Sequence, residues 1–398
     1  MKRLICKKMK ISSIICEYNP FHAGHLYHIE RTKQQTGCDF VIAVMSGSFV
    51  QRGLPAIYDK WARTDAALAN GADLVLELPT AYACASAERF AFGGVQLTEL
   101  TGIADTLSFG CETEDITILQ NLAELFASEP DSYKADLKKF LDTGCSFAAA
   151  RSKAAEKQIS GAGAILSESN AILAIEYLKA IRKLGSSLVP CPILRAGTSS
   201  EQSDNAEDKF ASARAVRNAI FCGKSLPEGT LPPDAEDIFR NCRPIFAEQF
   251  SDLLLYRLRT MTVDEIAEIA EVSEGLENKI HSAARTASSY TELLERIKSK
   301  RYPQSRLQRI LANCLLGITK SVHAAADSAP FIRVLGIRKE SRHLLSLLTE
   351  KAKAPVIISP ADINNIGLSL DIRATDIRSL LDSNKTAGRD YTEKLHIL

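Results

Sequence analysis

The sequence has no apolar run long enough to cross a lipid bilayer. A membrane-spanning helix needs about 20 consecutive apolar residues, and the apolar runs of this chain are much shorter. The basic start, Met1–Lys8, is not followed by the long apolar segment of a secretory signal peptide. We therefore expect a cytoplasmic protein without a membrane span, in which residues 1–8 are a disordered extension before a second candidate start at Met9.

The sequence also lacks closely paired cysteines and a strong net charge. Its ten cysteines include no CxxC pair, and a chain of 398 residues can bury a large core without disulfide bonds. We therefore expect reduced thiols. The formal net charge is only +1, so the chain has no overall attraction for nucleic acid, and any RNA contact requires a local basic patch.

Histidine, by contrast, is concentrated in one place. Three of the seven histidines, His22, His25 and His28, follow the apolar run 11–16 within a short stretch. The run predicts a buried strand that ends before the turn at Asn19–Pro20. The histidines therefore lie where a strand passes into a helix.

The expected helix begins near Gly24 and runs toward Lys33. The N–H groups of its first turn and the positive end of its dipole would attract a phosphate group. Imidazole donors at the same place could hold phosphate oxygens and stabilise charge that develops during transfer. The pattern predicts a triphosphate site.

Two other interpretations of the histidines stay open. His25 and His28 could share a metal ion, although no HExxH motif or CxxC pair accompanies them. The three residues could also be ordinary half-buried histidines. We favour phosphate binding without a protein-ligated metal, because a strand, a turn, a glycine and a helix occur together.

Alternating apolar runs and helical patterns predict an α/β fold. The runs are followed by helical stretches such as 60–70 and 88–100, which is typical of a Rossmann-like, doubly wound parallel sheet. Ligands of such sheets bind beyond the carboxyl ends of the strands. The expected strands are 11–16, 40–45, 74–78, 106–109 and 188–194.

The segment 223–233, which is rich in proline and glycine, predicts a domain boundary. We expect a Rossmann-like nucleotidyltransferase domain over residues 9–222 and a mostly helical domain over 234–398. Helices are expected at 171–184 and 210–221, and Thr262 to Glu265 form a capping box.

The motif His22-Ala23-Gly24-His25 resembles the (T/H)xGH signature of the HIGH-motif nucleotidyltransferases. On its own this motif is weak evidence, but its context resembles the bacterial tRNA(Met) cytidine acetate ligases more specifically. Blocks similar to that family follow in order along nearly the whole chain, at 17–28, 71–79, 107–112, 170–177 and 300–302.

The resemblance implies an ATP site made of the histidine loop and three later residues. His22 and His25 would be catalytic, and Gly110, Asn170 and Arg195 would bind ATP. From the residues alone, Gly110 could equally be a turn glycine, Asn170 a helix cap and Arg195 a surface ion-pair partner. The implied ATP-binding residues of the loop are Ile15, Cys16, Glu17, Tyr18, Asn19, Pro20, Phe21, His22, Ala23, Gly24, His25, Leu26, Tyr27 and His28.

The segment 212–217 resembles the second superfamily motif, SSTxxR. Ser212 and Arg217 would then hold the leaving pyrophosphate. The chain departs from the motif at Arg214, where serine or threonine is usual. Lys60 and Arg63 are interpreted as scaffold residues.

The segment 296–309 is basic and has no acidic residue. We expect Lys300, Arg301, Arg306 and Arg309 to contact the tRNA backbone, although a solvated charged face would have the same composition.

The resemblance implies an ATP-dependent ligase that forms acetyl-adenylate, with Mg²⁺ on the triphosphate. The acetyl group would then pass to the wobble cytidine of elongator tRNA(Met), giving N4-acetylcytidine. Two alternatives stay open. One is another adenylyl- or cytidylyltransferase that acts on a small metabolite. The other is a nucleotide-sensing regulator that binds nucleic acid through a helix-turn-helix at 262–284.

Overall fold

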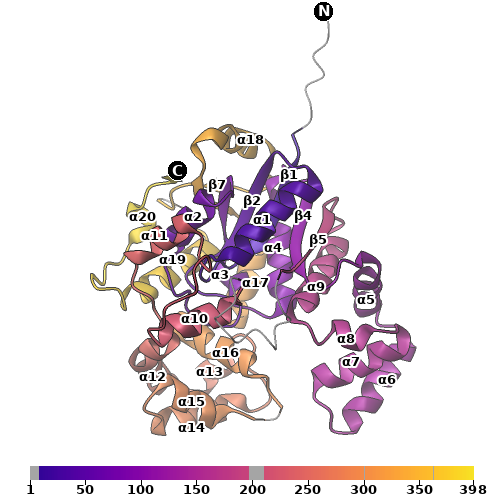
Figure 1. The fold of residues 1–398 in the computed structure, drawn as a ribbon. Helices are drawn as coiled ribbons and strands as arrows, with labels where there is room; N and C mark the ends of the chain where they lie inside the picture. The colour runs from indigo at the N-terminus through magenta and orange to yellow at the C-terminus, as the bar shows by residue number, and fades with distance from the viewer. Residues whose placement is uncertain (1–8, 197–209, 300, 362) are drawn as a thin grey trace, which may run out of the picture.

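The computed structural model describes residues 9–196, 210–299, 301–361 and 363–398. Its centre is an eight-stranded sheet in the order β5-β4-β1-β2-β3-β6-β7, with β8 paired to β6 (Figure 1). The strands are β1 Ile11–Cys16, β2 Phe40–Ser46, β3 Leu74–Leu78, β4 Thr106–Cys111, β5 Val189–Leu194, β6 Ile332–Ile337, β7 Val356–Ile357 and β8 His396–Ile397.

The first five strands form the parallel part of the sheet. Their order, β5-β4-β1-β2-β3, is that of a Rossmann-like sheet, in which the chain reverses its direction of growth between β1 and β4. All five expected strands are confirmed. The expected end of the fourth strand at 109 is wrong, because β4 continues to Cys111 and includes Gly110.

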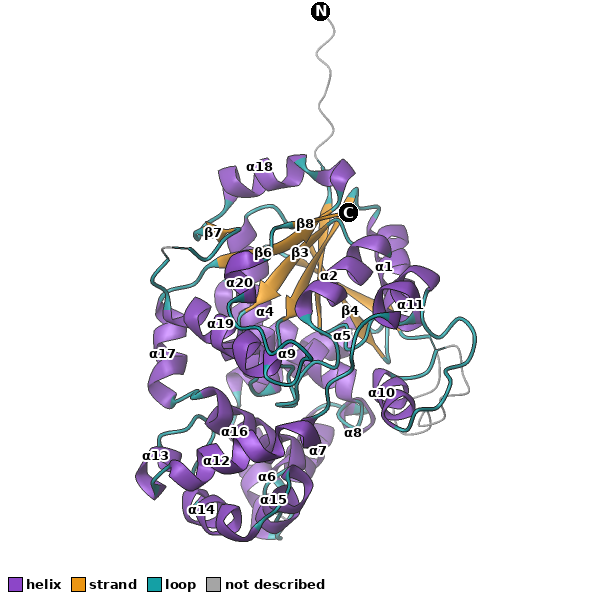
Figure 2. Cartoon of the chain, turned by 90° about the vertical axis from the view of Figure 1, so that its left-hand side faces the viewer, coloured by secondary structure: helices purple, strands orange, loops and turns teal. Residues whose placement is uncertain are grey.

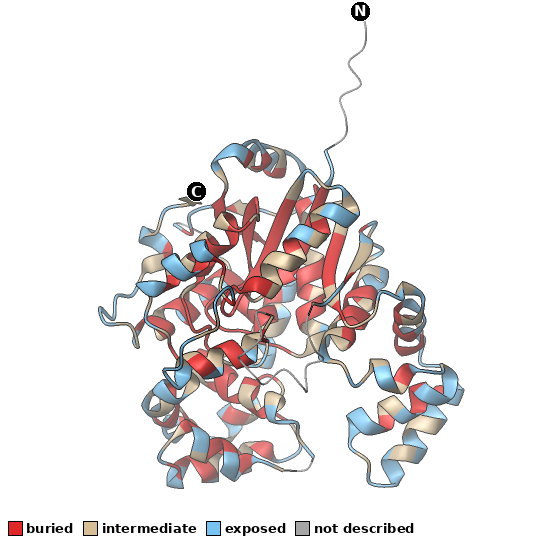
Figure 3. Cartoon of the chain, in the orientation of Figure 1, coloured by how far each residue is buried: buried red, intermediate tan, exposed pale blue. Residues whose placement is uncertain are grey.

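Helices cover both faces of this sheet, as the apolar character of its buried strands requires. One face packs against α1, α2 and α11, and the other packs against α4, α5, α9 and α18. Figure 3 shows the buried strands between helices whose outer sides are exposed. The bounds are α1 Ala23–Thr36, α2 Lys60–Ala69, α3 Thr80–Ala83, α4 Ala87–Thr101, α5 Ile116–Ser128, α9 Ser169–Leu184, α10 Ala213–Phe221, α11 Pro233–Arg240 and α18 His343–Lys351.

Two groups of helices extend from the sheet at the end toward which α10 lies (Figures 1 and 2). The first group follows α5 and comprises α6 Asp131–Asp142, α7 Phe147–Gln158 and α8 Ala162–Ile165. The second has its own apolar core and comprises α12 Ser251–Thr260, α13 Val263–Ala267, α14 Leu276–Thr286, α15 Tyr290–Ile297 and α16 Gln304–Leu316. The expected capping box is confirmed, because Thr262 and Glu265 cap each other at the start of α13.

The chain then returns to the sheet. β6 pairs antiparallel with β3, and β7 and β8 pair with β6. The apolar pattern of the sequence predicts no strand after residue 194, because a buried arginine, Arg333, and Gly336 interrupt the short apolar run of β6. The domain boundary expected at 223–233 stays a prediction. The remaining helices are α17 Lys320–Ser328, α19 Ile366–Ser379 and α20 Arg389–Thr392.

A buried ion cluster ties the C-terminal segment to the sheet. Lys60 Nζ lies 2.8 Å from Glu77 Oε1 on β3 and 2.7 Å from Asp390 Oδ1 on α20, with all three side chains at most 2% exposed. Burial lowers the pKa of Lys60, but the two carboxylates outweigh it and raise that pKa overall. These contacts agree with a scaffold role for Lys60.

Candidate active site

The histidine loop connects the end of β1 to α1 at the switch in strand order. Tyr18 has a left-handed backbone with φ +45°, and the Asn19–Pro20 peptide bond is cis. The side-chain oxygen of Asn19 accepts the N–H of Ile57 at 2.9 Å. The buried Arg63 donates to the carbonyl oxygen of Glu17 at 2.7 Å. These contacts within the protein hold the loop in place.

His22 and His25 cap the first turn of α1 for each other. The N–H of Gly24 donates to Nδ1 of His22 at 3.0 Å, and the N–H of His22 donates to Nδ1 of His25 at 3.3 Å. Because a neutral imidazole that accepts at Nδ1 carries its proton at Nε2, both rings keep an Nε2–H donor. The ring centroids lie 3.9 Å apart. The pair therefore forms a double donor at the positive end of α1.

His28 extends the cluster across the switch point. Its Nε2 atom lies 3.0 Å from the hydroxyl oxygen of Ser108 on β4. The same hydroxyl lies 2.6 Å from Oγ1 of Thr32 on α1. Ser108 thus joins the helix that carries the histidines to the neighbouring strand.

The surroundings of the three imidazoles favour their neutral form. Burial, followed by the positive charges of Arg195 and Arg217, lowers the pKa of His22 to about 3. Burial and Arg195 lower the pKa of His28 to about 4. Burial, the other two histidines and the same arginines hold the pKa of His25 well below its ordinary value. A bound anion would offset the positive charge of Arg195 and Arg217.

Arg195 and Asn170 meet at a carboxylate that the sequence analysis does not single out. Glu112 follows β4 and accepts the side-chain amide of Asn170 at 2.6 Å and the N–H of Ala171 at 2.9 Å. Arg195 Nε lies 4.0 Å from the same carboxylate. Asn170 is therefore not the cap of α9, since that helix begins at Ser169 after Glu168.

Gly110 lies beside this group, on β4. A Cβ atom built on Gly110 would meet only Cγ of Arg195, at 3.6 Å. The backbone of β4 is therefore open to a ligand at this position.

The second motif also reaches the histidine loop. Arg217 on α10 donates from Nη1 to the carbonyl oxygen of Asn19 at 2.7 Å. Ser212 is the cap of α10, where its hydroxyl accepts the N–H of Ala215 at 3.2 Å. Arg217 is thus placed beside the histidines, while the Ser212 hydroxyl is engaged in capping.

Other side chains of this region make contacts within the protein. Cys16 is buried, its thiol donates to the carbonyl oxygen of Val44 at 3.7 Å, and burial raises its pKa. Ile15 packs against Gly94 of α4. Lys33 donates to the carbonyl oxygen of Gly71 at 2.7 Å.

Arginine side chains of the basic segment 296–309 are largely engaged with neighbouring acidic residues. Arg301 Nη2 lies 2.6 Å from Glu274, and Arg309 Nη2 lies 2.7 Å from Glu271. Arg306 donates to the carbonyl oxygen of Glu271 at 2.8 Å. Lys300 lies outside the described residues. RNA contact by this segment stays a prediction.

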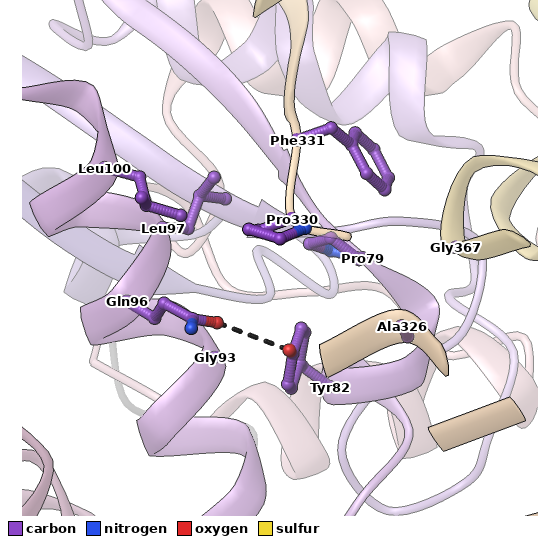
Figure 4. Close-up of a pocket in the computed structure, with 10 residues that line it drawn as sticks. All are labelled: Pro79, Tyr82, Gly93, Gln96, Leu97, Leu100, Ala326, Pro330, Phe331 and Gly367. Carbon is purple, nitrogen blue, oxygen red and sulfur yellow. Dashed lines mark hydrogen bonds between the residues drawn. The ribbon is translucent and has the colours of Figure 1, made fainter. Parts of the chain in front are cut away.

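Two hollows occur away from the histidines. Figure 4 shows a small crevice near Tyr82, whose hydroxyl donates to Gln96 at 3.3 Å. Its mostly apolar lining has no cationic side chain to hold phosphate. The second hollow has a volume of about 550 Å³ and is lined by three arginines, of which Arg378 and Arg389 are paired with acids. We assign neither to the nucleotide.

Comparison with known proteins agrees with this geometry. Residues 9–393 match the family described as HIGH Nucleotidyl Transferase. The tRNA(Met) cytidine acetate ligase of Acetivibrio thermocellus is 40% identical to this chain, and the match covers 98% of this chain and 100% of the relative. The ligase of Thermoanaerobacter sp. (strain X514) is 42% identical, with coverage of 97% and 99%.

Solved structures give the same result. Thermotoga maritima TmcAL bound with alpha-thio ATP superposes with a TM-score of 0.88 at 33% identity, over 98% of this chain and 100% of that chain. Its apo form gives a TM-score of 0.90 at 34% identity, with the same coverage. The chain therefore belongs to the HIGH nucleotidyltransferases and, among them, to the family of tRNA(Met) cytidine acetate ligases.

Proposed function

We propose that this protein activates acetate with ATP and transfers the acetyl group to the wobble cytidine of elongator tRNA(Met). The observation that carries the proposal is the pair of Nε2–H donors on His22 and His25, at the amino end of α1 and beside Arg195 and Arg217. This arrangement supplies neutral and cationic donors to a triphosphate. Acetate and tRNA are inferred as substrates from the family to which the chain belongs.

In the first step an acetate oxygen attacks the α-phosphorus of ATP in line. The new O–P bond forms as the bond to the bridging oxygen of pyrophosphate breaks, and acetyl-adenylate results. The nucleophile is already an anion, so no general base is needed. His22 and His25 would stabilise charge on the transferring phosphate, and Arg217 would hold the leaving pyrophosphate. Mg²⁺ bound to the triphosphate would neutralise further charge.

In the second step the exocyclic amine of the cytidine attacks the acetyl carbonyl carbon. A C–N bond forms, the C–O bond to AMP breaks, and the amine loses a proton. The products are N4-acetylcytidine in the tRNA and AMP. We place this reaction in the cytoplasm; in the part of the chain that the structure describes, no helix is long and apolar enough to span a membrane.

We assign the adenosine side of ATP to Gly110 and Asn170. The open backbone of Gly110 supports this, as does the fixed position of the Asn170 amide against Glu112. Arg195 would contact the phosphates, because its charge acts on all three imidazoles. The loop residues from Ile15 to His28 would wrap the nucleotide.

Acetate-dependent exchange of labelled pyrophosphate into ATP tests the first step on its own. We expect exchange in the wild-type protein and its loss in His25→Ala. His281→Ala is the matched control, because His281 lies on α14, outside the candidate site, and it should exchange normally. Exchange that persists in His25→Ala would remove the histidine pair from the mechanism.

A further inference from the structure

Arg52 is the single exposed residue in a long buried stretch of the chain. From Phe40 to Ala87 every other residue is buried or half-buried. The loop around Arg52 is closed by a bridge between Phe49 and Pro55. Within it, the N–H of Val50 donates to Leu54 at 2.9 Å, and the N–H of Gly53 donates to Val50 at 2.8 Å. The fold therefore presents one guanidinium to solvent from an ordered loop.

The neighbours of Arg52 fix its place between the histidine loop and the helical region. The N–H of Gln51 donates to Oε1 of Glu17 at 2.9 Å. Gly53 has a φ of +71°, and a Cβ atom built on it would lie 2.5 Å from Cα of Arg309 on α16. The loop thus touches the candidate active site on one side and the helical region on the other.

The charge of Arg52 is unpaired among the residues that the structure describes: its guanidinium forms no hydrogen bond or ion pair with them. The positive charge of Arg52 instead acts on the guanidinium of Arg217, which also lies near Arg214. Burial lowers the pKa of Arg217, and the charges of Arg52 and Arg214 lower it further. The negative charge of Glu17 raises it, but not enough to cancel these effects. The positive potential that these arginines share favours the binding of an anion near Arg52. Arg301 and Arg309, in contrast, already have acidic partners.

We propose that Arg52 binds a backbone phosphate of the acceptor RNA beside the cytidine that is acetylated. The proposal rests on the proposed function and adds a residue that positions the acceptor. An exposed arginine on the side of the helical region suits a phosphodiester that approaches from solvent. The phosphates of ATP already have donors in the histidine pair and the first turn of α1. Because the loop is ordered in advance, binding orders little more than the arginine side chain.

Arg52→Ala and Arg52→Lys test this proposal in the full-length protein. Affinity for unmodified tRNA is measured by fluorescence anisotropy at several salt concentrations, and affinity for ATP by calorimetry. We expect Arg52→Ala to weaken tRNA binding at least about fivefold and to reduce the slope of log Kd against log salt by about 0.7 to 0.9. Arg52→Lys should fall between this variant and the wild type. ATP affinity should change less than about twofold.

Arg342→Ala serves as the matched control, because Arg342 is also exposed but lies beside α18, at the other end of the sheet (Figure 1). Weaker ATP binding with unchanged tRNA binding in Arg52→Ala would assign Arg52 to the nucleotide and overturn the proposal. Unchanged affinity for both ligands would make Arg52 an ordinary surface charge and overturn it as well. A wild-type protein that binds no tRNA would refute the proposed function itself, a result that the Arg52 variants cannot mimic.

Discussion

Arg217 donates a hydrogen bond of 2.7 Å to the carbonyl oxygen of Asn19 and so joins α10 to the histidine loop. The contact leaves the remaining guanidinium donors of Arg217 beside His22 and His25, whose pKa values it lowers. A direct contact therefore joins the second motif to the first.

Arg217→Ala should weaken ATP binding by about tenfold or more, because a charge-assisted contact to phosphate is lost. Arg217→Lys should recover only part of the affinity, since lysine cannot reproduce the planar donor set. Calorimetry with ATP measures both. The control is Arg240→Ala, which removes an exposed arginine paired within α11. Wild-type affinity in Arg217→Ala would show that the second motif does not contact the triphosphate.

The histidines predict how stability depends on pH. The unfolded chain protonates histidine near pH 6.5, whereas the folded protein protonates His22 at about 3 and His28 at about 4. Between these values the unfolded state binds more protons. The free energy of unfolding therefore falls as the pH decreases below about 6.5, by about 1.4 kcal/mol per pH unit for each such histidine.

Urea unfolding at pH 7 and at pH 5 checks this in the wild type and in His28→Gln. The variant should lose part of the stability difference between the two pH values, because it lacks one of the depressed groups. An equal difference in both proteins would contradict the lowered pKa of His28. In the wild type, ATP should raise the histidine pKa values measured by NMR, because the bound anion favours imidazolium.

Glu112 should matter for both stability and ATP binding. Its carboxylate accepts the Asn170 amide and the N–H of Ala171 at the start of α9. Glu112→Ala should lower the free energy of unfolding by about 1 to 2 kcal/mol. It should also weaken ATP binding, because Asn170 and Arg195 lose a common partner. Glu114→Ala, an exposed neighbour on the same loop, should change neither quantity. If both variants behave alike in denaturant and in calorimetry, the role given to Glu112 is wrong.

Lys60 should act on folding through the buried ion cluster. Lys60→Met leaves Glu77 and Asp390 without their shared cation in the interior, which should cost about 3 to 5 kcal/mol. Urea unfolding at pH 7 measures this loss, and the exposed Lys224→Met should stay within about 0.5 kcal/mol of the wild type. A loss below about 1 kcal/mol in Lys60→Met would mean that water reaches the cluster.

Features that depend on local sequence could be predicted. Parallel strands buried on both faces are continuous apolar runs, so 11–16, 40–45 and 74–78 were recognisable. The first turn of α1 was recognisable from its glycine and histidines. The capping box at the start of α13 was recognisable from the spacing of Thr262 and Glu265.

Features that depend on distant partners could not be predicted. Glu112 and Asn170 are 58 positions apart, and Arg309 and Glu271 are 38 apart. Composition therefore shows a basic segment, but not the acids that fold against it. β6 could not be predicted from its own sequence, because its buried Arg333 is accommodated by contacts with residues near the C-terminus, among them Asp390.

Nucleoside mass spectrometry of the complete reaction tests the proposed transfer of acetate to tRNA. Purified protein is incubated with ATP, Mg²⁺, labelled acetate and bulk bacterial tRNA, and the tRNA is digested to nucleosides. We expect labelled N4-acetylcytidine with wild-type protein, and its loss in both His22→Ala and His25→Ala. Accumulation of AMP with acetate but no acetylated nucleoside, or ATP that stays intact, would refute the proposed function.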